Sequence, residues 1–255
     1  QGDESGTDPR AISENQTVHI QKAGARPAAG QVGAMRKLYI IGAGGFGREV
    51  AWLVDRINST GPVWRLQGFV DDDQRKHGRL EGRHPVVGGT ELLAGLDEEA
   101  WAVCAVGSAC TRRKVVERMQ QCGRVRFATL VDPSVLLSPS ATIGEGSIVC
   151  AGTILTVDVV VGKHVHINLD CTVGHDARIS DYSTLYPGVH VSGCATVGQE
   201  AELGTGSQII QGKRIGEGTI LGAGSVVVRD LPEWCTAVGV PARPVKYRDK
   251  PETIF

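Results

Sequence analysis

The chain has 255 residues, of which 41% are hydrophobic, and a formal net charge of −1 at pH 7. This composition suffices for a buried core, and the near-zero charge offers no basic surface for nucleic acid or an anionic membrane, so we expect neither partner. The seven cysteines never occur in a C-x-x-C spacing, which argues against a disulfide framework or a thiolate zinc site and favours a reducing cytoplasm.

The first segment, residues 1–35, is polar and rich in Gly, Ala and Gln, and it lacks the apolar core of a secretory signal. We expect a disordered leader or extension here, with the folded chain starting near Met35.

A glycine-rich motif follows the first apolar stretch, "KLYII". Gly42, Gly44 and Gly47 match G-x-G-x-x-G and precede the helix-compatible run "REVAWLVDRIN". Such glycines permit a tight turn and let phosphate oxygens approach the amides of a helix N-terminus. Alternatively, they only tighten the turn. A second strand then ends in Asp71 and Asp72, well placed for ribose hydroxyls or a base edge.

The segments "PVVGG", "TELLAGL", "WAVCAVG" and "TRRKVVERMQQC" continue the alternation of strand and helix. This pattern predicts a small doubly wound, Rossmann-like α/β domain over residues 36–128. Two mononucleotide halves plus a dehydrogenase substrate domain do not fit in that length, so a nicotinamide enzyme is the weaker interpretation.

A six-residue repeat occupies the next region. Every sixth residue from Val131 to Val227 is aliphatic, and the residues four positions later, from Val135 to Ser225, are small or β-branched, except Lys213. This period indicates short strands and tight corners, three to a triangular coil of 18 residues, with aliphatic corner residues filling the axis. We therefore expect a parallel β-helix over residues 129–232. The period leaves its handedness open, and Lys213 is either a substrate contact or a local bulge.

The stretch "TVGHDARIS" places His175 beside Asp176 within this repeat. His175 follows Val173 by two positions, so its ring is expected to point outward at a coil edge. A second possibility is a zinc site built from several of the histidines, His164, His166, His175 and His190. Their spacing does not match such a site and no supporting carboxylates are evident, so we expect no metal.

The order of these parts and the motifs "GAGGFG", "FVDDD", "AVG", "VDPSV", "VGHD" and "GVPARPVK" resemble the bacterial hexapeptide-repeat sugar acetyltransferases. That family includes sialic acid O-acetyltransferase and the nucleotide-amino-sugar N-acetyltransferases, and the likeness covers residues 36–247. The resemblance implies a left-handed β-helix, acetyl-CoA as acyl donor and a homotrimer that binds acetyl-CoA between neighbouring protomers. It also implies that the front domain holds the nucleotide of the sugar.

The resemblance further implies roles for individual residues. His175 is the expected general base, Asp176 its orienting partner and the Gly193 amide an oxyanion donor, which also contacts the cofactor. Phe46 and Thr184 stand where the family often has histidine. The expected acceptor site comprises Gly42, Gly44, Gly45, Phe46, Gly47, Asp71, Asp72, Asn168 and Thr184.

For acetyl-CoA, the expected contacts are Gly222, Ala223 and Gly224, followed by Arg243 and Lys246 in a C-terminal loop and tail, residues 233–255. The leading hypothesis is acetyl transfer from acetyl-CoA to the amino group of a nucleotide-linked amino sugar. Two alternatives remain: O-acetylation of a sugar such as sialic acid or a polysaccharide precursor, and a non-catalytic solenoid that binds a nucleotide.

Overall fold

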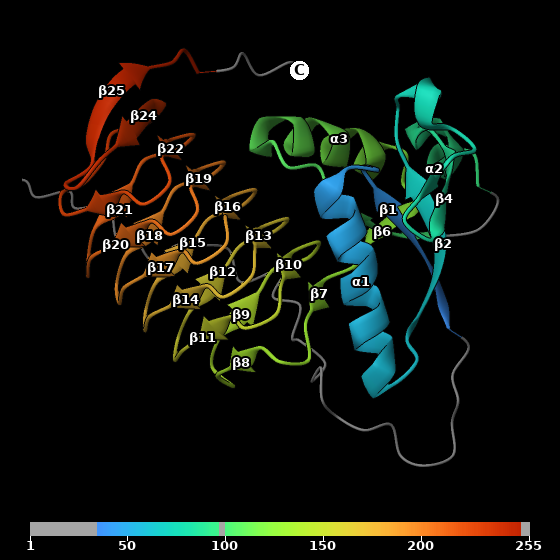
Figure 1. The fold of residues 1–255 in the computed structure, drawn as a ribbon, viewed down its shortest axis with the longest axis horizontal. Coiled ribbons are helices and arrows are strands. Elements are labelled where there is room, and N and C mark those ends of the chain that lie inside the picture. Colours follow the sequence, from blue (N-terminus) through green and yellow to red (C-terminus); the bar gives the residue numbers. More distant parts are fainter. Residues whose placement is uncertain (1–34, 97–99, 251–255) are drawn as a thin grey trace, which may run out of the picture.

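A computed structural model describes residues 35–96 and 100–250; apart from Met35, the expected leader, residues 1–35, lies outside this range. The front domain is a six-stranded sheet in the order β3-β4-β2-β1-β5-β6, parallel except for the β3–β4 pair, with helices packed against it (Figure 1). Its elements are β1 Arg36–Ile41, α1 Gly45–Thr60, β2 Trp64–Val70, the short 3-10 turn η1 Gln74–Lys76, β3 Leu80–Glu81, β4 His84–Gly88, α2 Thr90–Ala94, β5 Ala100–Cys104, α3 Ala109–Gln121 and β6 Val125–Phe127.

The glycine motif forms the turn between β1 and α1. Gly42 has φ 105°, in the region that favours glycine, and Gly44 is the residue before the first turn of α1. A Cβ on Gly47 would lie 2.1 Å from the carbonyl oxygen of Gly42, so only glycine lets the helix pack on this turn. β2 ends at Val70, directly before Asp71, as the sequence predicts.

Residues 130–227 form a left-handed parallel β-helix built from two-residue strands. Each strand pairs with the strand 18 residues later; Ile148, His166 and Thr184 are successive partners. The strands form three faces. Face 1 contains β7 Leu130–Val131, β10 Ile148–Val149, β13 His166–Ile167, β16 Thr184–Leu185, β19 Glu202–Leu203 and β22 Ile220–Leu221.

The other two faces continue the same 18-residue stacking. Face 2 contains β8 Leu136–Leu137, β11 Ile154–Leu155, β14 Thr172–Val173, β17 His190–Val191, β20 Gln208–Ile209 and β23 Val226–Val227. Face 3 contains β9 Thr142–Ile143, β12 Val160–Val161, β15 Arg178–Ile179, β18 Thr196–Val197 and β21 Arg214–Ile215. The chain visits faces 1, 2 and 3 in turn, and we name each corner by the faces it joins.

The aliphatic column fills the axis, but not from the corners. Each of its members is the second residue of a strand, and from Ile143 to Val227 all of them are buried. The prediction that they are corner residues is therefore wrong. The corners turn through a left-handed residue three positions later, such as Asp158 at φ 57° or Asp176 at φ 59°.

Glycines that directly follow the aliphatic residue serve close stacking of the coils. A Cβ on Gly174 would lie 2.6 Å from the backbone nitrogen of Gly193 in the next coil, and Gly174 has no positive φ. Lys213 sits in an unshifted ladder, because Thr196 pairs with Arg214 and Val197 with Ile215. The alternative of a local bulge at Lys213 is thus wrong.

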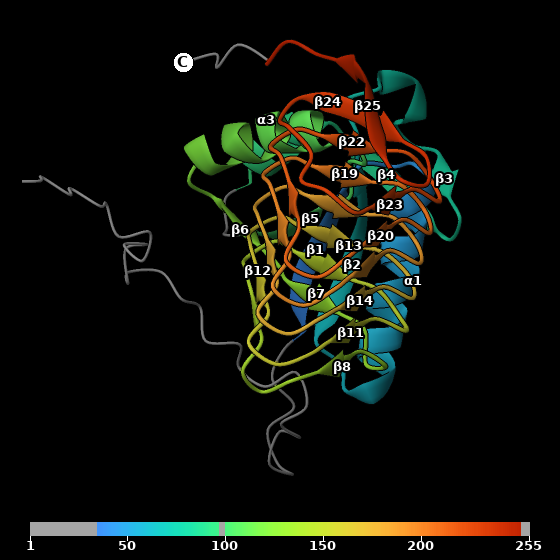
Figure 2. The same ribbon diagram turned by 90° about the vertical axis from the view of Figure 1, so that its left-hand side faces the viewer.

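The front domain packs against face 1 of the β-helix (Figures 1 and 2). Arg112 of α3 is fully buried there and donates to the carbonyls of Val106 and Gly107, to Nδ1 of His166 and to Oγ1 of Thr184. At the C-terminal end, β24 Cys235–Val238 extends face 1 and pairs antiparallel with β25 Arg243–Tyr247. Among the described residues, no helix is both long and apolar enough to span a bilayer.

Candidate active site

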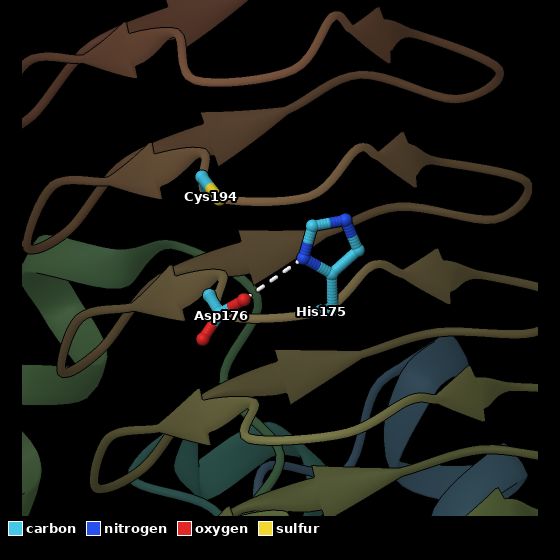
Figure 3. A group of neighbouring side chains, drawn as sticks. All are labelled: His175, Asp176 and Cys194. Atoms are coloured by element: carbon cyan, nitrogen blue, oxygen red, sulfur yellow. Dashed lines mark hydrogen bonds and ion pairs between the residues drawn. The ribbon is translucent and has the colours of Figure 1, made fainter.

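His175 and Asp176 form a hydrogen-bonded pair at the 2–3 corner (Figure 3). Nδ1 of His175 lies 2.8 Å from Oδ2 of Asp176, and the side chains are 50% and 59% exposed. Val173, two residues earlier, is fully buried in the axis. A carboxylate accepts from Nδ1–H, which leaves the lone pair of the neutral ring on Nε2. The pair therefore presents a proton acceptor to solvent.

Gly193 lies in the next coil, 18 residues after His175, with the imidazole against it. A Cβ at position 193 would be 2.4 Å from Nε2 of His175 and 2.6 Å from Cε1. The imidazole of His175 fits here only because Gly193 has no side chain. Within the described part of the chain the Gly193 N–H has no hydrogen-bond acceptor. A free N–H donor, the kind of group that stabilises an oxyanion, thus stands beside the free ring nitrogen.

Two cations continue along the same 2–3 corner beyond Gly193. Lys213 lies one coil further on and is half-buried; Arg229 follows in the next coil and is exposed. Neither side chain has an ion pair among the residues that the structure describes. Sequence analysis noted Lys213 without assigning it and missed Arg229; counting steps of 18 from Gly193 through Gln211 leads to Arg229.

The two predicted acidic residues of the front domain have internal partners. Oδ2 of Asp71 accepts from the backbone N–H of Ala43 at 2.9 Å and from Nζ of Lys76 at 2.8 Å. Burial opposes ionisation, but these hydrogen bonds outweigh it and lower the pKa of Asp71. Asp71 therefore braces the glycine turn.

Asp72 accepts from the backbone and hydroxyl of Thr90 at 2.8 and 2.7 Å and from Arg118 at 2.7 Å. Burial again opposes ionisation of this carboxyl, and the hydrogen bonds still lower its pKa. Asp72 and Arg118 also line a cavity of about 400 Å³ between η1, α2 and α3. Of the two aspartates, Asp72 is the one that borders open space.

Thr184 is not available to a substrate. It is 4% exposed, and its hydroxyl accepts from Arg112, so the expected acceptor contact is wrong. Phe46 is half-buried, with its ring 4.9 Å from that of His166. Asn168 lies at the 1–2 corner and its Oδ1 accepts from the N–H of Leu169 at 2.7 Å. None of the three shares a corner with His175.

Of the six residues predicted to contact CoA, Gly193 lies beside His175, and the other five lie on other parts of the β-helix. Gly222, Ala223 and Gly224 form a turn at the 1–2 corner, where Ala223 and Gly224 are exposed. Arg243 and Lys246 are exposed on β25, at the end of face 1. Within one chain these five residues do not meet the His175 corner.

The buried histidines do not converge on a cation site with His175. His164 packs edge-on to Phe127 and stacked on Tyr182, and burial lowers its pKa to about 3. His166 donates from Nε2 to the carbonyl of Cys104 at 2.8 Å; burial lowers its pKa well below the usual value, with Arg112 adding to the effect. Both are neutral members of the contact between the domain and face 1.

The glycine turn and the His175 corner lie on opposite sides of the β-helix. Phe46 of the turn packs on His166, which belongs to face 1. In a triangular coil the corner opposite face 1 is the 2–3 corner, where His175 stands. A ligand held by the turn therefore cannot reach His175 of the same chain without crossing the β-helix.

Comparison with known proteins agrees with this architecture. Residues 37–119 match the PglD N-terminal domain family. The acetyltransferase domain of PglB from Neisseria gonorrhoeae is 34% identical, with a TM-score of 0.74, and the match covers 82% of this chain and 100% of that one. The chain belongs to the hexapeptide-repeat sugar acetyltransferase family.

Two further members of this acetyltransferase family match almost end to end. Perosamine N-acetyltransferase from Caulobacter crescentus, solved as a histidine-to-asparagine variant with CoA and GDP-perosamine, is 32% identical over 84% of this chain and 98% of its own, with a TM-score of 0.74. GDP-perosamine N-acetyltransferase from Escherichia coli O157:H7 is 29% identical, and the match covers 81% of this chain and 95% of that enzyme.

Serine acetyltransferases match over a smaller part. The Synechococcus elongatus enzyme is 35% identical over 95 residues, and the chain spans only 38% of its length. The sugar acetyltransferases named above, in contrast, match over more than four fifths of this chain.

Proposed function

We propose that this acetyltransferase moves an acetyl group from acetyl-CoA to the amino group of a nucleotide-linked amino sugar. One observation carries the chemistry: Nε2 of His175, oriented by Asp176, stands beside the free N–H of Gly193. A proton acceptor and an oxyanion donor at one point are what acyl transfer from a thioester to an amine requires. The full-length relatives named for N-acetylation of GDP-perosamine support the amine as acceptor.

The reaction needs no covalent enzyme intermediate. The amine attacks the thioester carbonyl while Nε2 of His175 removes a proton from the attacking nitrogen. Asp176 holds Nδ1–H and stabilises the imidazolium that forms. The Gly193 N–H donates to the carbonyl oxygen as it becomes negative. Collapse of the tetrahedral adduct expels the CoA thiolate, which takes up the proton from His175.

The acyl donor would lie along the 2–3 corner. With its thioester beside His175 and Gly193, its phosphates extend past Lys213 and Arg229, two cations that form no ion pair with the described residues. Phosphate groups are bound well by such side chains. The predicted contacts at Gly222, Ala223, Gly224, Arg243 and Lys246 reach the same donor only if a neighbouring protomer supplies them.

The acceptor would bind in trans. Its phosphates would meet the turn from Gly42 to Gly47, including Gly44 and Gly45, while Asp72 borders the cavity between η1, α2 and α3. Because this turn and His175 lie on opposite sides of one chain, the sugar would meet the histidine of another protomer. A closed ring of three copies supplies each site with both halves, so a homotrimer is part of the proposal.

A direct assay tests this function. Purified protein receives acetyl-CoA and, separately, nucleotide-linked amino sugars and their hydroxyl counterparts; thiol release and product mass are recorded. Acetylation of the amine supports the proposal. Acetylation confined to hydroxyls would assign the chain to O-acetyl transfer, and an absence of any transfer together with nucleotide binding would leave a binding module. The donor and the unpaired thiols agree with a cytoplasmic location, which we include in the proposal.

A further inference from the structure

Three side chains of different donor type gather at the 2–3 corner: the imidazole of His175, the carboxylate of Asp176 and the thiol of Cys194 (Figure 3). One ligand atom from each lies within 4.8 Å of the other two, and all three residues are exposed. Among the described residues this is the one group of three or more His, Cys, Asp and Glu close enough to hold a metal ion.

The backbone fixes this gathering. Asp176 and Cys194 occupy equivalent left-handed turn positions one coil apart, at φ 59° and 58°. The N–H of Cys194 donates to the carbonyl of His175 at 2.7 Å, which holds the thiol above the pair. The neighbouring turns of this corner carry Asp158 and Gly212 at the same position, so neither adds a thiol.

We propose that His175, Asp176 and Cys194 form a reversible site for a thiophilic divalent cation such as Zn²⁺, and that the cation inhibits the enzyme. Imidazole, carboxylate and thiolate are the donors zinc prefers, at about 2.0–2.3 Å from the metal. Two ligands of one zinc ion lie roughly 3.3–3.8 Å apart in tetrahedral geometry. Nδ1 of His175 and Oδ2 of Asp176, now 2.8 Å apart, therefore have to separate by about 0.5 Å, and the thiol of Cys194 has to approach by at most about 1 Å; rotation about the bonds of these exposed side chains provides both movements.

The inhibition follows from the tautomer of His175 and rests on the proposed function. The cation takes the Nδ1 lone pair, replaces the hydrogen bond to Asp176 and leaves the ring proton on Nε2. Nε2 then has no lone pair for the proton of the attacking amine. Cys194 releases its thiol proton to solvent when its sulfur binds the metal. A chelator restores the original pair and with it the activity.

Cobalt binding tests the site without activity. Co²⁺ titrated into the full chain should give a thiolate-to-cobalt charge-transfer absorption at one metal per chain. Cys194→Ser and Cys194→Asn should abolish this absorption and weaken Zn²⁺ binding at least about tenfold. Asn suits the left-handed turn, so one of the two variants should keep its fold. Cys110→Ser, which removes a half-buried thiol near the start of α3, is the matched control.

Zn²⁺ inhibition provides the second readout. The wild type and Cys110→Ser should lose acetyl transfer on adding Zn²⁺ and regain it with EDTA, while both Cys194 variants stay active. Inhibition of the Cys194 variants at the same Zn²⁺ concentration, or an unchanged cobalt spectrum in them, overturns the proposal. Acetyl transfer by a protein that shows no thiolate-to-cobalt absorption would refute the cation site and leave the proposed function intact. A thiolate-to-cobalt absorption in a protein that transfers acetyl to no amine would instead refute the proposed function and leave the cation site intact.

Discussion

The β-helix and the front domain of this chain are specified in different ways. In the β-helix one rule repeats every six residues, so the position of each turn residue follows from its place in the count. The front domain has no repeat, and it attaches to face 1 through individual buried polar contacts such as those of Arg112. The repeat thus places His175 on its corner, whereas unique contacts decide where the nucleotide turn lies relative to it.

The largest expected effect concerns the corner that the repeat builds. Replacing His175 with Gln should lower kcat by about 10²–10⁴-fold, because the substituted amide accepts no proton at neutral pH. The unfolding temperature should stay unchanged, since the side chain is half exposed. Steady-state kinetics and thermal melts measure both. His190→Gln, an exposed histidine on face 2, is the control and should retain activity; equal losses in the two variants would remove the special role of His175.

The second effect concerns the contact that the repeat does not specify. Arg112→Met removes a buried guanidinium and leaves several carbonyls and His166 without a donor, so the free energy of unfolding should fall by about 3 kcal/mol or more. Denaturant titration measures the loss. Lys114→Met, an exposed residue of the same helix, should change stability little. A stable Arg112→Met protein would mean that apolar packing alone holds the domains together.

A pH-dependent effect tests another polar contact between the front domain and face 1, at the other end of that face. Asp132 is buried and accepts from Arg56 of α1 at 2.5 and 2.9 Å. Burial opposes its ionisation, but the bonds from Arg56 and Ser134 lower its pKa from 3.8 to about 2. A depressed pKa contributes stability above pH 3.8 that is lost as the pH falls toward 2.

Asp132→Asn should therefore cost about 2 kcal/mol at pH 7, and the difference from wild type should shrink between pH 4 and pH 2. Urea unfolding across that range measures it. Asp158→Asn changes an exposed carboxylate at a left-handed turn and should show no such trend. A pH-independent difference at Asp132 would show that shape, not charge, matters there.

The smallest effect concerns the donor path. Lys213→Ala should raise KM for acetyl-CoA by several-fold with little change in kcat, because an exposed or half-buried cation contributes about 1 kcal/mol to a phosphate contact. Initial rates at varied acetyl-CoA give the value. Arg79→Ala, an exposed cation of the front domain, is the comparison and should leave KM unchanged. A kcat effect without a KM effect would place Lys213 nearer the reacting atoms than we propose.

The sequence predicted much of the fold and the exposed pair of the site, His175 and Asp176. The six-residue period identified the β-helix, and the outward place of His175 follows from its offset to Val173. The sequence could not reveal that the hydroxyl of Thr184 accepts a hydrogen bond from Arg112, because the two residues are 72 positions apart and meet only where the domains touch. Likewise, the engagement of Asp71 with Ala43 and Lys76 depends on how the glycine turn closes.

Mixed trimers test the central claim most directly. His175→Gln lacks the base, and Gly44→Asp places a carboxylate where phosphate should bind, at a position with open space before α1. Each variant alone should be inactive. Unfolded together in equal amounts and refolded, they should regain about one quarter of wild-type activity, since three quarters of random trimers are mixed and each holds one intact junction. No regain, with mixed trimers demonstrated by mass, would contradict a site shared between protomers.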